Sequence, residues 1–274
     1  MARGRSIPRL LVLSWVIVAF AACSDSGRAV ADAFSGDGGG GVGEAGAGTI
    51  KLTGRVVDFE SCSAPSGCQG VAQMRVALFY DRNIASGLTQ ASGAFTLKNV
   101  PNGVRTYLYV SDASGKDRYL STLQGNVVTT EGKSIHTVET YAIARDKALY
   151  RSIGKEIGAE AGRDGIYVGL ALNRETQNLR PVAGASVTIT PTMATVRFYK
   201  ANLDLEPGAK EAFFPETWTS TGIQGLFVGV AGAAVEDYSI LALTADKKDF
   251  TPVLAPVGKG FVTLGLHYVS DASP

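Results

Sequence analysis

The chain has 274 residues, of which 45% are hydrophobic and 19% charged, with 26 basic residues against 25 acidic ones. This near-neutral balance, without a basic stripe or an arginine cluster, excludes nucleic acid as a partner and excludes polybasic contact with a membrane. The two histidines, His136 and His267, form no H-x-H or H-E-x-x-H spacing, and Gly-x-Ser-x-Gly is absent. We therefore expect no enzyme activity, no metal site and no cofactor.

Residues 1–22 have the pattern of a secretion signal. Three arginines precede an apolar run at residues 10–22, which is too short for a permanent transmembrane helix. The Phe-Ala-Ala-Cys sequence ending at Cys23 resembles a bacterial lipobox, with Phe20 where an aliphatic residue is usual, so Cys23 would carry the lipid. An ordinary cleaved signal peptide is the alternative. Ser24 after the cysteine resembles an outer-membrane address, so we expect a lipid-anchored protein of the cell envelope.

Residues 23–49 are rich in glycine and contain little that could be buried. Such a segment behaves as a coil, and residues 24–48 would span roughly 25–30 Å between their ends. A glycine-rich phosphate loop is rejected, because no strand precedes the segment and no Gly-Lys-Ser/Thr follows it. We predict a flexible tether that holds the folded part away from the membrane.

Cys62 and Cys68 close a short loop that contains proline and glycine. In an oxidising compartment such a pair is typical of a disulfide. A metal site would need further ligands, and neither histidine is close in sequence. We predict a Cys62–Cys68 disulfide, and the alternative is a pair of free thiols.

Residues 50–143 contain short runs of alternating apolar and polar residues, separated by turn residues, which is the spacing expected of a β-sandwich. The expected strands lie at residues 50–57, 74–80, 95–97, 106–110 and 134–143.

Residues 144–163 change period and link this part to the next. Leu149, Ile153 and Ile157 follow a spacing of four, with charged residues between them. This pattern predicts an amphipathic helix of three to four turns, stopped by Gly162 and Gly165. Its apolar stripe either packs on the rest of the chain, which we favour, or binds a partner.

Residues 164–274 return to strands, expected at residues 166–172, 188–190, 196–198, 221–230, 238–243 and 261–269. This part carries about 21 extra residues between its second strand and its later glycine turn. The extra residues and their flank are rich in aromatic side chains, namely Phe198, Tyr199, Phe213, Phe214 and Trp218. These five are candidate binding residues, because aromatic faces stack on sugars and peptides. The alternative, which we favour, is that they pack in the core of an extended hairpin.

The two strand-rich parts carry copies of one pattern. Residues 54–57, 70–76 and 89–103 of the first part correspond to residues 169–172, 181–187 and 221–227 of the second. Each copy ends in Thr-x-x-x-Gly-x-Phe. In that motif the glycine suits a turn of positive φ, and the following phenylalanine is expected to enter the core.

This repeated pattern resembles the carboxypeptidase regulatory-like domain, a transthyretin-like sandwich that occurs in tandem in bacterial surface lipoproteins. The resemblance implies an all-β chain of two seven-stranded Ig-like sandwiches, residues 50–143 and 164–274, joined by the short amphipathic helix at 144–163. Phe95 and Phe227 should then occupy matching core sites, and few contacts should cross the helix-linked boundary.

The resemblance specifies a fold and leaves the function open. We expect a non-enzymatic, membrane-anchored lipoprotein that acts as a structural or protein-docking module, with an envelope protein or a surface glycan as partner. The alternative is a carbohydrate- or peptide-binding module that uses the aromatic-rich insertion of the second domain.

Overall fold

The computed structural model describes most of the chain beyond residue 47 and two residues before it. The described residues are 20–21, 48–63, 67–103, 105–128, 135–175, 178–200, 212–231, 235–244, 249–250 and 252–269. The predicted lipid site, Cys23, lies outside the described residues, as does nearly all of the predicted tether.

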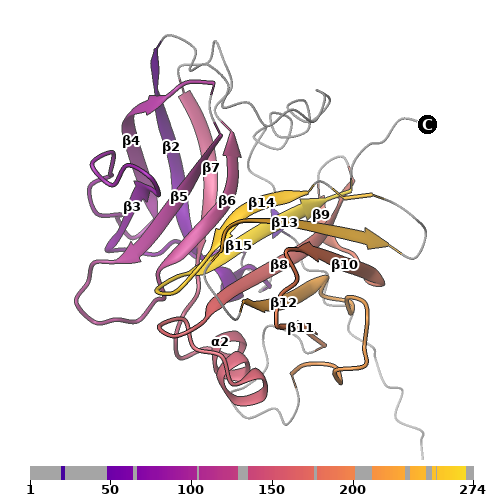
Figure 1. Cartoon of the computed structure of the whole chain (residues 1–274). Helices are drawn as coiled ribbons and strands as arrows, with labels where there is room; N and C mark the ends of the chain where they lie inside the picture. Colours follow the sequence, from indigo (N-terminus) through magenta and orange to yellow (C-terminus); the bar gives the residue numbers. More distant parts are fainter. Residues whose placement is uncertain are drawn as a thin grey trace, which may run out of the picture.

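The fold is all-β, as predicted, and its strands pack in sandwich-like layers (Figure 1). The strands of the first repeat are β2 (Thr49–Asp58), β3 (Met74–Leu78), β4 (Ala94–Pro101), β5 (Arg105–Asp112), β6 (Thr122–Val128) and β7 (Ile135–Ala142). Those of the second are β8 (Gly165–Glu175), β9 (Asn178–Pro181), β10 (Ala185–Thr190), β11 (Thr195–Phe198), β12 (Leu226–Ala231), β13 (Val235–Thr244), β14 (Val253–Val257) and β15 (Val262–Tyr268). A two-residue strand, β1 (Phe20–Ala21), pairs with β9.

The two repeats arrange their strands in the same order. In the first repeat β2 lies between β4, its antiparallel neighbour, and β7, its parallel neighbour. In the second, β8 lies in the same way between antiparallel β12 and parallel β15. The remaining strands also correspond. In the first repeat β5 lies between β3 and β6, and in the second β13 lies between β10 and β14.

Four strands, β1, β6, β9 and β14, were not predicted from the sequence, and β6 and β14 are equivalent to one another. In β6 the buried polar side chains of Thr122 and Gln124 interrupt the apolar pattern, and Gly125 follows. In β14 a proline, Pro256, stands among the apolar residues. Neither segment therefore has the alternation that marks a half-buried strand.

A threonine before β4 ties the first repeat's turn to its neighbouring strands. The Thr89 hydroxyl donates to the Val71 carbonyl O at 2.7 Å and accepts the Met74 backbone N–H at 2.9 Å. The Gly93 carbonyl O accepts the Val56 N–H at 2.8 Å. At Gly93 φ is 78°, and a Cβ would lie 2.0 Å from the Val56 carbonyl O, so this position requires glycine.

The second repeat makes the same contacts with its own residues. The Thr221 hydroxyl donates to the Val182 carbonyl O at 2.7 Å and accepts the Ala185 N–H at 3.0 Å. The Gly225 carbonyl O accepts the Ala171 N–H at 2.8 Å. At Gly225 φ is 61°, and a Cβ would lie 2.4 Å from the Ala171 carbonyl O. The two copies of the sequence pattern thus build one hydrogen-bonded unit twice.

The two phenylalanines occupy matching core sites, as predicted. Phe95 pairs with Gly54 across β4 and β2, and Phe227 pairs with Gly169 across β12 and β8. Each ring lies over its glycine, because a Cβ at Gly54 would lie 2.7 Å, and one at Gly169 2.1 Å, from the Cζ atom of the paired ring. Both phenylalanines are buried.

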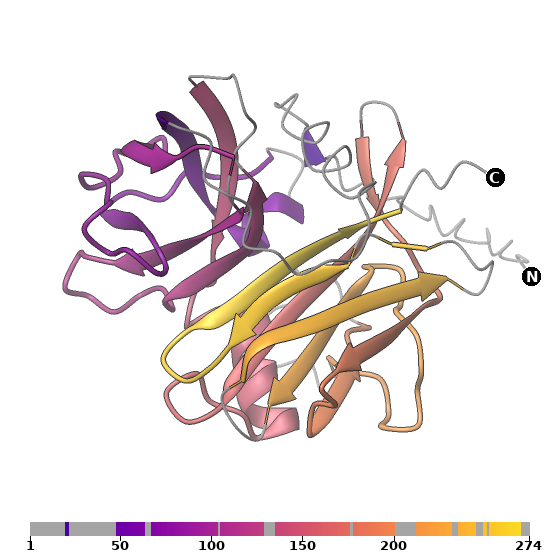
Figure 2. The ribbon, with the colours of Figure 1, turned by 45° about the horizontal axis from the view of Figure 1, so that its top comes forward.

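The expectation that few contacts cross between the repeats is wrong. Strand β6 of the first repeat pairs in parallel with β15 of the second, with Thr122 opposite Val262 and Gln124 opposite Leu264. One continuous sheet therefore runs from β3 through β5, β6 and β15 to β8. Figure 2 shows β6 and β15 side by side at the junction of the repeats.

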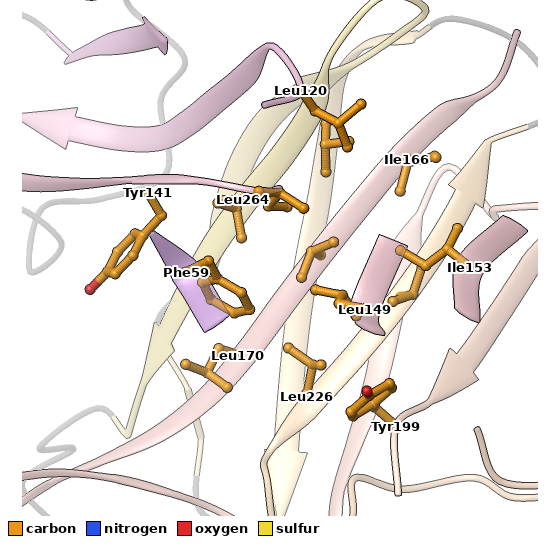
Figure 3. Close-up of a cluster of buried hydrophobic side chains, with 14 of the residues drawn as sticks. Phe59, Leu120, Tyr141, Leu149, Ile153, Ile166, Leu170, Tyr199, Leu226 and Leu264 are labelled. Atoms are coloured by element: carbon orange, nitrogen blue, oxygen red, sulfur yellow. The ribbon is translucent and has the colours of Figure 1, made fainter. Parts of the chain in front are cut away.

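Apolar side chains of both repeats meet on the two faces of this shared sheet. On one face Phe59 and Tyr141 of the first repeat pack in one cluster with Leu170 and Leu264 of the second (Figure 3). On the other face a cluster joins Leu123 of β6 to buried residues of β14. A third cluster fills the space between the two sheets of the first repeat.

The connecting helix is shorter than predicted. It consists of α2 (Ala148–Ser152) and one π-helical turn (Ile153–Ile157), and it ends at Gly158, whose φ is 73°, rather than at Gly162. Leu149 and Ile153 are fully buried in the cluster of Figure 3. The favoured interpretation of the apolar stripe, packing on the rest of the chain, is confirmed.

Candidate functional site

The structure separates the five aromatic residues predicted for binding. Phe198, Tyr199 and Phe213 are buried, and Tyr199 and Phe213 meet edge to face with ring centres 5.2 Å apart. These three rings form part of the core, in line with the alternative interpretation of the insertion. Only Phe214, half-buried, and Trp218, 45% exposed, face the surface.

Phe214 and Trp218 form a stacked pair at the surface of the second repeat. Their ring centres lie 4.4 Å apart, and their planes differ by 10°. Arg197 on β11 holds this segment in place: its Nε and Nη2 donate to the Phe214 carbonyl O at 3.3 and 2.9 Å. Its Nη1 also pairs with the exposed Glu216 at 3.3 Å. The side of Trp218 that does not stack on Phe214 therefore faces solvent, and Arg197 holds the segment on which the ring stands.

The glycine turn next to this pair adds a second exposed apolar side chain. Phe214 packs on Gly222, where a Cβ would lie 2.8 Å from the ring, and Ile223 beside it is 71% exposed. The equivalent turn of the first repeat carries Ala91 at the position of Ile223. An apolar patch of Phe214, Trp218 and Ile223 is thus specific to the second repeat.

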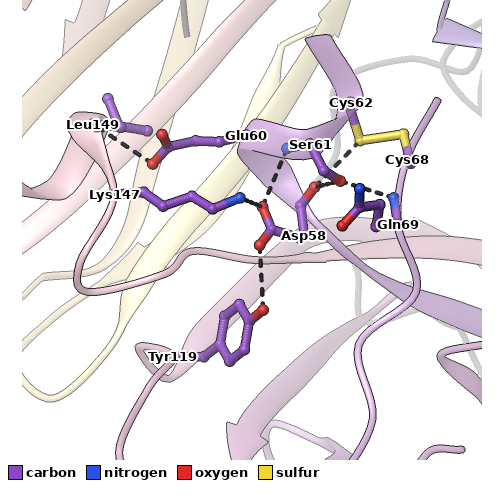
Figure 4. Close-up of polar contacts among 9 residues, drawn as sticks. All are labelled: Asp58, Glu60, Ser61, Cys62, Cys68, Gln69, Tyr119, Lys147 and Leu149. Atoms are coloured by element: carbon purple, nitrogen blue, oxygen red, sulfur yellow. Dashed lines mark hydrogen bonds and ion pairs between the residues drawn. A yellow bond between two sulfur atoms is a disulfide. The ribbon is translucent and has the colours of Figure 1, made fainter. Parts of the chain in front are cut away.

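A polar network lies where the end of β2 meets the connecting helix (Figure 4). Asp58, whose carboxylate is buried, accepts from Lys147 Nζ at 3.0 Å and from the Tyr119 hydroxyl at 3.2 Å. Burial, the Asp58 charge and its hydrogen bond raise the pKa of Tyr119 to about 12. The predicted Cys62–Cys68 disulfide is formed beside this network.

Glu60 in the 3-10 turn Phe59–Ser63 caps α2 from another part of the chain. Its Oε1 accepts the Leu149 backbone N–H at 3.3 Å, and Lys147 at the N-cap provides no side-chain cap of its own. Glu60 is 5% exposed, and burial raises the pKa of its carboxyl from 4.5 to about 7. The first turn of the helix is therefore held by two acidic residues, Asp58 and Glu60.

A second carboxylate, Glu156, anchors the insertion to the helix. Its two oxygens accept the backbone N–H groups of Ala212 at 2.7 Å and of Phe213 at 3.1 Å. Nearby, the Tyr199 hydroxyl is buried without a hydrogen-bond partner among the described residues. Burial, with the charges of Glu60 and Glu156, raises the pKa of Tyr199.

The histidines lie apart from these groups. His267 is fully buried on β15, where its Nε2 lies 2.9 Å from the Tyr167 hydroxyl. His136 lies on β7, opposite Leu52 of β2. Within the described ranges no group of three or more His, Cys, Asp or Glu side chains could hold a metal ion. In the same part of the chain, no helix has the length and apolar character to cross a membrane.

A second aromatic cluster, at the junction of the repeats, was not predicted from the sequence. Phe79 lies within 6.4 Å, centre to centre, of three other rings: Tyr80 beside it, Tyr109 on β5, and Phe261 before β15. Phe261 lies about 180 residues away in the sequence, so no local pattern connects it to the others. The sequence signals for this cluster were the Phe-Tyr pair after β3 and the two tyrosines of β5, which are two positions apart.

No family model matches the chain, and no curated protein matches it. Among solved structures, the minor pilin GBS52 of Streptococcus agalactiae is 8% identical with a TM-score of 0.25, covering 82% of this chain and 98% of its own. Shaft pilin SpaA of Lactobacillus rhamnosus GG is 8% identical with a TM-score of 0.23, covering 83% and 99%.

A third solved structure is a carbohydrate-binding protein. CBMbc of family CBM26, from Eubacterium rectale Amy13K and in complex with maltoheptaose, is 10% identical with a TM-score of 0.25, covering 80% of this chain and 93% of its own. Likenesses at these TM-scores carry no argument about this chain. Its all-β assignment rests on the strand pairings described above.

Proposed function

We propose that the protein is a non-enzymatic lipoprotein of the cell envelope that acts as a structural or protein-docking module. In this proposal Cys23 carries the lipid in the outer membrane, residues 23–49 form the tether, and residues 50–143 and 164–274 are tandem carboxypeptidase regulatory-like sandwiches. The observation that carries the proposal is the parallel pairing of β6 with β15, which joins the two repeats in one sheet.

A spacer or docking wall must keep its shape when a partner binds or pulls on it. Two sandwiches linked by a helix alone would move relative to each other, because few contacts would resist the motion. Here backbone hydrogen bonds connect the repeats, and apolar side chains of both repeats are buried on each face of the shared sheet. Such an arrangement supports a single rigid unit at the end of a tether.

Rigidity can be measured with spin labels placed on exposed strand positions of the two repeats. Lys98 on β4 and Thr188 on β10 are both exposed. Double electron–electron resonance on the protein that carries both Lys98→Cys and Thr188→Cys, each spin-labelled, should give one narrow distance distribution. A broad distribution would contradict a rigid docking wall.

Anchoring is tested separately with Cys23→Ser. The wild-type protein should partition into the detergent phase, whereas the variant should be soluble or uncleaved. Equal release of both into the aqueous phase would refute the lipid anchor. Crosslinking in intact cells should capture an envelope protein with the wild type but not with Cys23→Ser. Equal capture by both proteins would contradict docking at the membrane.

A second candidate function is binding of a carbohydrate or peptide at the insertion. The observation that favours it is the Phe214–Trp218 stack, which leaves the outer side of Trp218 open beside Ile223. Trp15 lies in the predicted signal, so Trp218 is the sole tryptophan of the processed chain. Its fluorescence should be quenched by iodide and protected by a bound neutral oligosaccharide, and Trp218→Ala should abolish that binding. Fluorescence that resists iodide would oppose this candidate.

A further inference from the structure

Arg82, in the turn after β3, has a guanidinium group that is exposed yet fixed. Its Cζ lies 3.5 Å from the centre of the Tyr109 ring and 5.0 Å from the centre of the Phe79 ring. Its Nε donates to the Phe79 carbonyl O at 2.9 Å. Stacking on a ring removes water from one face of the cation and fixes its orientation, so the Nη groups are held ready for an anion.

Arg82 differs in its partners from the three arginines that form ion pairs within the described chain. Arg145, Arg163 and Arg197 pair with Asp117, Asp164 and Glu216, respectively. For Arg82 the described ranges contain no salt bridge. The adjacent Asp81 forms no salt bridge with Arg82 within these ranges, and its Oδ1 accepts the Asn83 backbone N–H at 3.1 Å. The anion that complements Arg82 is therefore not provided by the described part of the chain.

An exposed aromatic ring, that of Tyr80, also contacts Phe79. Tyr80 is 68% exposed, and its ring centre lies 5.0 Å from that of Phe79 and 5.7 Å from that of Tyr107. Both contacts are edge to face, at 71° and 78°, so neighbouring rings support Tyr80. The Tyr80 ring centre and the Arg82 Cζ each lie 5.0 Å from the Phe79 ring centre, so they are at most about 10 Å apart. A short oligosaccharide can contact both at such a separation.

We propose that Tyr80 and Arg82 form a binding site for a glycan whose sugar rings carry carboxylates, such as a polyuronate. The apolar face of a pyranose ring would stack on Tyr80, as sugars do on aromatic side chains. Its carboxylate would accept hydrogen bonds from the Nη groups of Arg82, whose planar shape suits a carboxylate. This site lies in the first repeat and is independent of the lipid anchor and of the Trp218 patch.

The test is titration of the purified full-length protein with polygalacturonate, with its fully methyl-esterified form as the matched neutral ligand. The wild type should bind the acid form, bind the ester at least about tenfold more weakly, and lose affinity as salt increases. Arg82→Ala should weaken binding of the acid form by at least about tenfold, because a charged hydrogen bond is lost. Tyr80→Ala should also weaken it, and should weaken the residual binding of the ester.

Arg118→Ala is the control, since Arg118 is also exposed beside a tyrosine but its Cζ lies 5.9 Å from the Tyr119 ring centre. It should bind like the wild type. Arg82→Lys keeps the charge and should still bind several-fold more weakly, because an ammonium group cannot pair with a carboxylate through a planar fork. This variant and the ester comparison remain informative if Arg82→Ala does not fold.

Three results would overturn the proposal. Equal binding of the acid and the ester would remove the role of the carboxylate. Equal loss of binding in Arg82→Ala and Arg118→Ala would show a general charge effect rather than a site. Binding of polyglutamate with the same affinity and the same dependence on Arg82 would identify an acidic peptide, rather than a glycan, as the ligand.

Discussion

Truncation of the two matched phenylalanines tests whether the repeats unfold together. Phe227 is fully buried over Gly169, and Phe95 is 6% exposed over Gly54. Replacing either by alanine removes a buried ring and leaves a cavity, which costs about 3–5 kcal/mol. For a folded unit of this size, a loss of 1 kcal/mol lowers Tm by roughly 2–4 °C, so each variant should melt about 6–20 °C lower.

The assay is differential scanning calorimetry of the wild type and of each variant. Because β6 and β15 share hydrogen bonds and Phe59 packs with Leu170, we expect one transition in every case. Phe95→Ala and Phe227→Ala should lower the same transition. Leu88→Ala, at a side chain that is 50% exposed, is the control and should change stability by less than about 0.5 kcal/mol. Two transitions, each lowered by one variant alone, would refute the argument that the shared sheet makes one cooperative unit.

Four further substitutions test individual contacts. Burial raises the pKa of Glu60 from 4.5 to about 7, so the wild type should lose roughly 3 kcal/mol of stability as pH rises from 4.5 to 7. Chemical denaturation of Glu60→Gln should show a flatter pH dependence and higher stability at pH 8, and an unchanged pH profile would contradict the buried carboxyl. Gly169→Ala should destabilise strongly, because its Cβ would meet the Phe227 ring, whereas Gly162→Ala, with open space around it, should be neutral or stabilising in the same denaturation assay. Removing the disulfide with Cys62→Ser should cost about 2–3 kcal/mol for so short a loop, and thiol titration of the unreduced, unfolded wild type should find no free thiol in the pair.

The internal repeat was readable from the sequence because local chemistry imposes it. Gly93 and Gly225 must adopt positive φ against a neighbouring carbonyl, and the threonine four residues before each accepts a backbone N–H from the first residue of the adjacent strand. A requirement of this kind restricts the residue type at one position, so it leaves the same signature in both copies. The disulfide was readable for a similar reason, since its cysteines are only six positions apart in the sequence.

The aromatic insertion shows where the sequence was insufficient. Phe213 and Phe214 are adjacent and chemically identical, yet Phe213 is buried against Tyr199 while Phe214 supports Trp218 at the surface. Composition indicates that aromatic residues are present, but it does not indicate which side of each ring is covered. Which ring is covered depends on Glu156 of the connecting helix, which binds the backbone of this segment from more than fifty residues away.

The sequence by itself determined the strand-rich repeat, because turn residues and apolar alternation act over a few neighbouring positions. Only the tertiary structure decided how the repeats meet. Strand β6 contains buried polar residues and no clear alternation, and its parallel pairing with β15 joins residues about 140 positions apart. The same is true of Phe261, whose ring packs against Phe79 from about 180 positions away in the chain. Contacts of this kind arise when distant surfaces are buried together, and no local pattern in the sequence encodes them.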